Sequence, residues 1–130
     1  MGNWYSIDDF FSKSIPSGDI VINATTFRGS AFANRTGITS VTIVNNLTFT
    51  TNQFSPFTGC TGITSVSAPK LTRANNKLFN GCTNLQTVDL PKLTTINGDQ
   101  FIESSKVVYL VFPSFSGSIY NNALRFNTLL

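Results

Sequence analysis

Four stretches of the chain place apolar residues at the same spacing. Each stretch begins with Phe, reaches an aliphatic residue six positions later, and has further apolar residues three and five positions beyond it. The stretches span residues 32–44, 57–69, 79–91 and 101–113, so their starting points are 25, 22 and 22 residues apart. A period of this size is typical of repeat proteins in which each unit forms one coil of a stack.

The matching positions form four columns of apolar side chains. They are Phe32, Phe57, Phe79 and Phe101; Ile38, Ile63, Leu85 and Val107; Val41, Val66, Val88 and Leu110; and Ile43, Ala68, Leu90 and Phe112. Alternation at the last two columns, as in Val88-Asp89-Leu90, places both apolar side chains on one face of a strand. The pattern therefore predicts one short parallel strand per coil, with the columns stacked inside.

Turn residues sharpen the pattern in the second and third repeats. Gly59-Cys60 and Gly81-Cys82 follow the Phe residues, and a proline follows each strand at positions 69 and 91. These units closely resemble the BspA-like leucine-rich repeat family, whose units read roughly Ala-Phe-x-Gly-Cys-x-x-Leu-x-x-Val-x-Leu-Pro. The first repeat departs from the motif with Asn34-Arg35, and the fourth departs with Glu103-Ser104.

The columns and the resemblance together predict a leucine-rich-repeat solenoid of about four coils with little regular helix. We expect an N-terminal cap at residues 1–26 that includes a strand at 20–22, repeats at 27–118, and an incomplete coil or C-terminal cap at 119–130. The apolar residues of this last segment predict a longer array, an unusual cap or contact with another subunit.

The resemblance also implies a function. BspA-like repeats are similar to those of bacterial surface proteins and phage tail proteins, which implies a non-catalytic recognition, adhesion or structural module that binds a protein or a glycan. The alternative is a stand-alone intracellular inhibitor or scaffold that binds one protein.

Charge and hydropathy limit the partners and the location. The net charge of +3 comes from nine basic residues without a basic run, so nucleic acid is not an expected partner. No apolar segment approaches the length of a membrane-spanning helix, and the N-terminal residues lack a signal-peptide pattern. We expect a soluble chain, at the cell surface or in a virion if it is part of a larger protein, and otherwise in the cytoplasm.

Catalytic and metal chemistry are not predicted. The chain has no His, which removes the commonest general base and every His-containing zinc site. The six acidic residues are too scattered for a catalytic pair, and no cofactor is expected. Cys60 and Cys82 share one column, within disulfide reach, and buried unpaired thiols are the favoured interpretation over a bridge.

A binding surface is predicted on the outward positions of the strands. These positions change from small hydroxyl residues in the first two repeats to Val108, Tyr109 and Val111 in the fourth, where a partner or a covering tail is expected. With Gln86 and Asp89 of the third repeat, these three are the candidate binding residues. Lys70 and Lys92 share another column near Arg73, where a solvated edge is the favoured interpretation over an anion site.

Overall fold

The computed structural model describes residues 3–5, 17–25, 32–47, 56–75, 77–97, 102–103, 106–116 and 124–125. Within these ranges the regular secondary structure consists of short strands and contains no helix. The strands are β1 (Asn3–Tyr5), β2 (Gly18–Ile22), β3 (Ile38–Ile43), β4 (Ser65–Ser67), β5 (Arg73–Asn75), β6 (Thr87–Asp89), β7 (Thr95–Asn97), β8 (Ile102–Glu103), β9 (Tyr109–Val111) and β10 (Leu124–Arg125).

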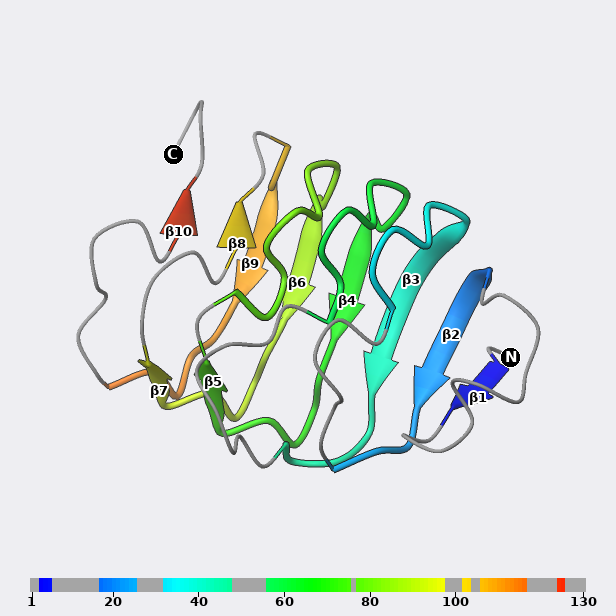
Figure 1. The fold of residues 1–130 in the computed structure, drawn as a ribbon. Coiled ribbons are helices and arrows are strands. Elements are labelled where there is room, and N and C mark those ends of the chain that lie inside the picture. Colours follow the sequence, from blue (N-terminus) through cyan, green and yellow to red (C-terminus); the bar gives the residue numbers. More distant parts are fainter. Residues whose placement is uncertain are drawn as a thin grey trace.

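The strands stack into a parallel β-solenoid, as predicted. The main sheet has the order β1-β2-β3-β4-β6-β9, and its strands run side by side in one direction (Figure 1). Two smaller parallel pairs, β5 with β7 and β8 with β10, lie elsewhere on the coil circumference. The solenoid has about three turns, slightly fewer than the four coils predicted.

The register of the main sheet confirms the repeat alignment. Val41 pairs with Val66, Val66 with Val88, and Val88 with Leu110. The predicted strand at 20–22 forms a further rung, since Ile20 pairs with Val41. β1 adds another rung beside β2. The division into cap, repeats and C-terminal segment stays a prediction.

The predicted Phe column forms a continuous stack inside the coils. The ring centroids of Phe32 and Phe57 are 5.6 Å apart, and those of Phe57 and Phe79 are 5.7 Å apart. The backbone of Phe79 then bridges to Ile102, which is fully buried, so the start of the fourth repeat is shifted by one residue while its strand β9 keeps the predicted alignment. Phe101, predicted to continue the column, lies outside the described residues.

The turn after each Phe explains one departure from the family motif. Asn34, Gly59 and Gly81 all have positive φ angles, of 62°, 74° and 87°. A Cβ atom at Gly81 would lie 2.6 Å from the backbone nitrogen of Gly59, so stacking as well as φ requires glycine there. Asn34 preserves the turn because Asn tolerates the left-handed region. Glu103, at the position of Gly81 in the predicted alignment, belongs to β8, and Ser104 lies outside the described residues.

The β9 end of the stack is less well covered than its centre. Leu110, Phe112 and Phe115 are half-buried, and the rings of Phe112 and Phe115 pack edge to face at 5.6 Å. Of the predicted C-terminal segment only β10 is described, and it pairs with β8. Within the described residues, no helix has the length and apolar character needed to cross a membrane.

Candidate functional site

The outward positions of the main sheet form one continuous surface, which we call the sheet face. Its first row pairs Ser40, Ser65, Thr87 and Tyr109, and its second row pairs Thr42, Ser67, Asp89 and Val111. A third row contains Thr39, Thr64, Gln86 and Val108, joined by successive backbone N–H···O=C bonds of 2.9, 2.8 and 2.8 Å. The parallel register therefore aligns outward side chains from four different repeats.

The structure brings the five candidate binding residues together. Gln86 and Asp89 lie on the coil of β6, while Val108, Tyr109 and Val111 lie on the neighbouring coil of β9. Val108 is 75% exposed and Tyr109 is 59% exposed, whereas Val111 is half-buried. Two large apolar side chains thus adjoin an exposed amide and an exposed carboxylate. Whether these residues bind a partner stays a prediction.

The opposite end of the sheet face carries a carboxylate that the sequence analysis did not assign to it. The Asp19 carboxylate accepts hydrogen bonds from Ser40 Oγ at 2.7 Å and Thr39 Oγ1 at 3.2 Å. These two bonds, with that from Ser40 the stronger, hold the pKa of Asp19 below its ordinary value. The pairing of Asp19 with Ser40 could have been inferred from the spacing that relates Ile20 to Val41.

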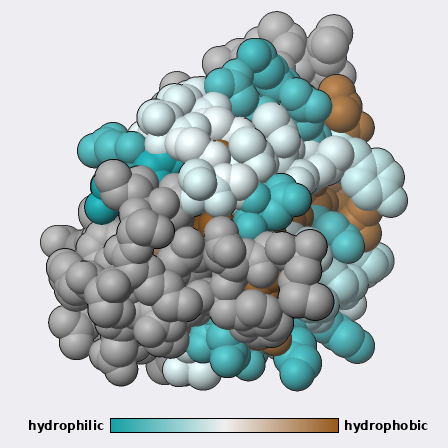
Figure 2. All heavy atoms as spheres, turned by 90° about the vertical axis from the view of Figure 1, so that its right-hand side faces the viewer, coloured by the Kyte–Doolittle hydropathy of each residue, from teal (hydrophilic) through white to brown (hydrophobic). Residues whose placement is uncertain are grey.

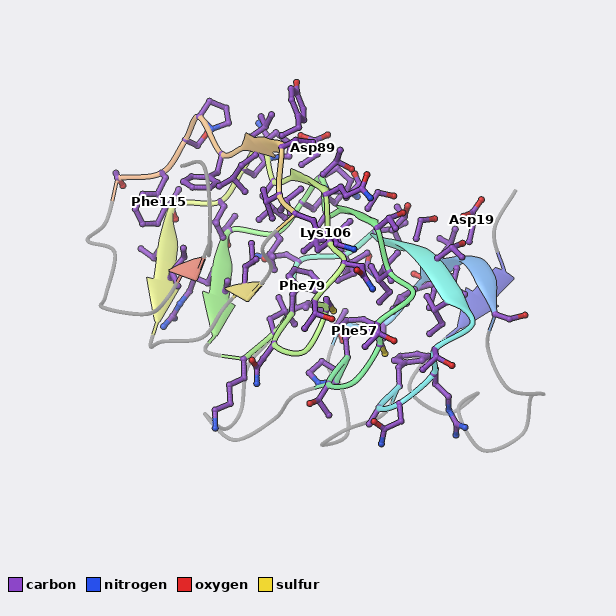
Figure 3. The ribbon with its side chains drawn as sticks, turned by 90° about the horizontal axis from the view of Figure 1, so that it is seen from above. Asp19, Phe57, Phe79, Asp89, Lys106 and Phe115 are labelled. Carbon is purple, nitrogen blue, oxygen red and sulfur yellow. The ribbon has the colours of Figure 1, made fainter. Side chains whose placement is uncertain are left out.

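The character of the sheet face changes along the stack. Asp19 and Asp89 are widely separated along it, and Phe115 lies farther still toward the β9 end (Figure 3). Viewed from the β1 end, the described surface is mostly hydrophilic or neutral (Figure 2). A ligand on this face would therefore meet hydroxyl and carboxylate groups near β2 and β3, and apolar groups near β9.

Polar side chains in the turns form hydrogen bonds from one coil to the next. The Asn46 side chain accepts a hydrogen bond from Thr72 N at 3.0 Å and donates one to Thr72 Oγ1 at 3.0 Å. Asn84 Nδ2 donates to the carbonyl oxygen of Thr61 at 2.6 Å, and Lys106 Nζ donates to Asn84 Oδ1 at 2.6 Å. These bonds join residues in adjacent coils and add to the backbone pairing of the stack.

The two cysteines have a packing role in this structure. Both thiols are free and fully buried. Cys60 Sγ donates to the carbonyl oxygen of Phe32 at 3.0 Å, and Cys82 Sγ lies 3.7 Å from that of Phe57. Burial raises the pKa of both thiols, so they remain protonated and poorly nucleophilic. The described residues contain no group of three or more His, Cys, Asp or Glu side chains placed to hold a metal ion.

The stacked parallel strands, the internal Phe column and the repeated turns define a leucine-rich-repeat solenoid. A family model described as BspA type leucine-rich repeat region matches residues 7–130 with six copies, a longer range than the four repeats found in the sequence analysis. The chain belongs to this family. No curated protein and no solved structure matches it. Membership indicates a repeat-based protein-interaction module with a fold that is typically non-catalytic.

Proposed function

We propose that the chain is a non-catalytic recognition module that binds a protein ligand through the β9 end of the sheet face. The observation that carries this proposal is the exposure of two adjacent large apolar side chains, 75% for Val108 and 59% for Tyr109. Covering a side chain of this size contributes about 1.5 to 3 kcal/mol. A partner that covers both would therefore gain a substantial part of its binding free energy there.

Tyr109 supplies the central contact in this proposal. Tyrosine is enriched among residues that dominate protein interfaces, because its flat ring offers a large contact area and its hydroxyl forms directional bonds. The ring stands in the same row as Thr87, on the strand next to Gln86 and Asp89. These two polar groups would orient the ligand, the amide as donor and acceptor and the carboxylate as acceptor.

The biological setting is also part of the proposal. Membership in the BspA type family supports a role within a bacterial surface protein or a phage tail protein that binds a receptor. The genomic surroundings test this setting. A reading frame that continues into further surface-protein modules, or neighbouring tail genes, would support it. An isolated reading frame among cytoplasmic genes would favour an intracellular scaffold.

Ligand capture followed by substitution tests the binding site. The folded chain is immobilised, retained proteins from a cell-envelope extract are identified and purified, and their affinities are measured by surface plasmon resonance. Tyr109→Ala is expected to weaken binding at least about tenfold. Thr42→Ala, on the same face but in β3, serves as the matched control and is expected to leave the affinity unchanged.

Two further measurements make the result decisive. The melting temperature of Tyr109→Ala should stay within a few degrees of the parent chain, because the side chain is exposed. The same set of side chains also suits a neutral glycan, so a glycan array is run alongside. If Tyr109→Ala binds the purified partner with unchanged affinity, the proposed binding site is wrong. If the chain binds glycans and no protein, the ligand is a glycan and the proposed protein ligand is wrong.

A further inference from the structure

The β9 strand is an open edge of the main sheet. It pairs with β6 on one side, and within the described residues no strand pairs with its other side (Figure 1). Native sheets commonly protect such an edge with charged side chains, proline or a covering segment. Residues 107–112, which include β9, are all aliphatic or aromatic. The edge therefore lacks the charged residues that discourage pairing with another strand.

One carbonyl oxygen per coil accepts N–H bonds from the coil that follows it. Thr64 N donates to the carbonyl oxygen of Thr39 at 2.9 Å, and Gln86 N donates to that of Thr64 at 2.8 Å. Val108 N donates in turn to the carbonyl oxygen of Gln86 at 2.8 Å. The carbonyl oxygen of Val108 is the next in this series, and it accepts no hydrogen bond from the described part of the chain. An acceptor that three earlier coils use is therefore open at the β9 edge.

One backbone amide per coil shows the same break in the series. Ala68 N donates to the carbonyl oxygen of Asp89 at 3.1 Å, and Leu90 N donates to that of Val111 at 2.8 Å. The equivalent amide of the β9 coil is Phe112 N, which has no acceptor among the described residues. Burial changes at the same place, since Leu90 is fully buried and Phe112 is half-buried. A strand laid against β9 would pair both open backbone groups and cover Phe112.

We propose that β9 binds an extended segment of another polypeptide, which adds to the main sheet as one further parallel strand. This inference rests on the proposed function and specifies the protein ligand of that site as a strand. Aliphatic residues stack on one another in the columns that end at Leu110 and Phe112. The segment would therefore place one aliphatic residue on Leu110 and a second, two positions later, on Phe112. Its outward residues would lie beside Tyr109 and Val111.

A second copy of this chain fits the β9 edge less well. Strands β2, β3, β4 and β6 already have a neighbour on each side, so parallel stacking of two copies would bring β1 of one onto β9 of the other. Asn3 of β1 pairs with Ile20, which pairs with Val41, so Asn3 belongs to the column of Leu110. Such stacking would set an amide against an aliphatic side chain, and burying a polar group without a partner is costly.

A peptide that copies one coil tests whether β9 accepts a strand. The peptide copies residues 84–91 with both ends capped, so that Leu85, Val88 and Leu90 supply the inward side chains that are fully buried in the folded chain. It is titrated into the ¹⁵N-labelled full chain, and NMR follows the backbone amides. The Phe112 amide is expected to shift downfield as it gains an acceptor, whereas the Ile22 amide in β2 should not move.

Methylation of the peptide backbone separates strand pairing from hydrophobic contact. In the folded chain the Gln86 and Thr87 amides donate to the preceding coil, at 2.8 and 3.1 Å, whereas the Leu90 amide donates to the following coil. Methylation of the Gln86 and Thr87 nitrogens of the peptide should therefore weaken binding at least about fivefold. The matched control is methylated at the Val88 and Leu90 nitrogens, which face away from β9, and its affinity should stay within about twofold.

Several outcomes would overturn strand addition at β9. Absence of peptide binding at millimolar concentration would do so, as would equal losses from the two methylated peptides. Shifts confined to the Asn3–Tyr5 amides would place the peptide at the β1 edge instead. A dimer of the chain alone in sedimentation velocity, with the Leu110 and Phe112 amides in its interface, would make a second copy the occupant.

Failure of strand addition is distinguishable from failure of the proposed function. The proposed function is judged by the effect of Tyr109→Ala on the affinity for the captured protein. If that substitution weakens capture while the two methylated peptides bind equally well, the site at Tyr109 stands and strand addition is wrong. If Tyr109→Ala leaves capture unchanged, the proposed function is wrong, whatever the peptides show.

Discussion

The centre of the solenoid and its β9 end are built from the same repeat and differ in what covers them. In the central coils Val88 and Leu90 are fully buried, with rungs on both sides. At the β9 end, Leu110 and Phe112 hold the equivalent inward columns but are only half-buried. A side chain in a stack is buried by its neighbouring rungs as much as by its own. The repeat pattern alone therefore does not determine burial.

The largest expected effect on stability comes from removing one ring of the Phe column. Phe57→Ala removes a fully buried ring that stacks on Phe32 and Phe79, and it should lower the free energy of unfolding by about 3 to 5 kcal/mol. Phe115→Ala, at the half-buried end, should lower it by about 1 to 2 kcal/mol. Urea denaturation followed by circular dichroism measures both. Equal losses would contradict the difference in burial between the two regions.

The next effect concerns the stacked turns. Gly81→Ala should lower the free energy of unfolding by about 2 to 4 kcal/mol, because it adds a left-handed φ penalty and a Cβ that meets the Gly59 backbone. Asn34→Gly occupies the equivalent turn without a new atom and should change stability by about 0.5 kcal/mol or less. Thermal unfolding compares the two variants. A neutral Gly81→Ala would show that the turns are not packed as closely as the structure indicates.

The smallest expected effect lies on the polar end of the sheet face. Since hydrogen bonds lower the pKa of Asp19 in the folded state, its charged form stabilises the fold above the unfolded-state pKa. This contribution disappears as the pH falls through the folded pKa, and it is small because Asp19 is exposed. Ser40→Ala should raise the NMR titration midpoint of Asp19, while Ser67→Ala should not. A midpoint unmoved by Ser40→Ala would exclude the hydroxyl as the cause.

The period of the apolar residues predicted most of the architecture. Pairs such as Val66 with Val88 could be assigned because one residue per rung faces the interior at a constant spacing. The same spacing placed Tyr109 beside Thr87 and Asp89 beside Val111, so the neighbours in the candidate site were also predictable. The exposure of Val108 and Tyr109 was not predictable, because it depends on what lies against the last strand.

Local departures from the repeat were harder to predict. Asn34 looked like a loss of the Gly-Cys motif, yet it keeps the positive φ of Gly59 and Gly81. Ile102 bridges to Phe79, one residue later than the repeat alignment predicted. A single-sequence pattern treats every repeat as equivalent, whereas backbone conformation adapts to the residue at each turn.

The sequence by itself determined that this chain stacks, which side chains share a column and which strand positions point outward, because all three follow from one repeated spacing. Only the tertiary structure decided which columns are fully buried and that Val108 and Tyr109 are exposed together. It also decided that the Asp19 carboxylate accepts hydrogen bonds from two hydroxyl groups. These properties depend on contacts between coils. A residue acquires these neighbours on folding, and they belong to other repeats than its own.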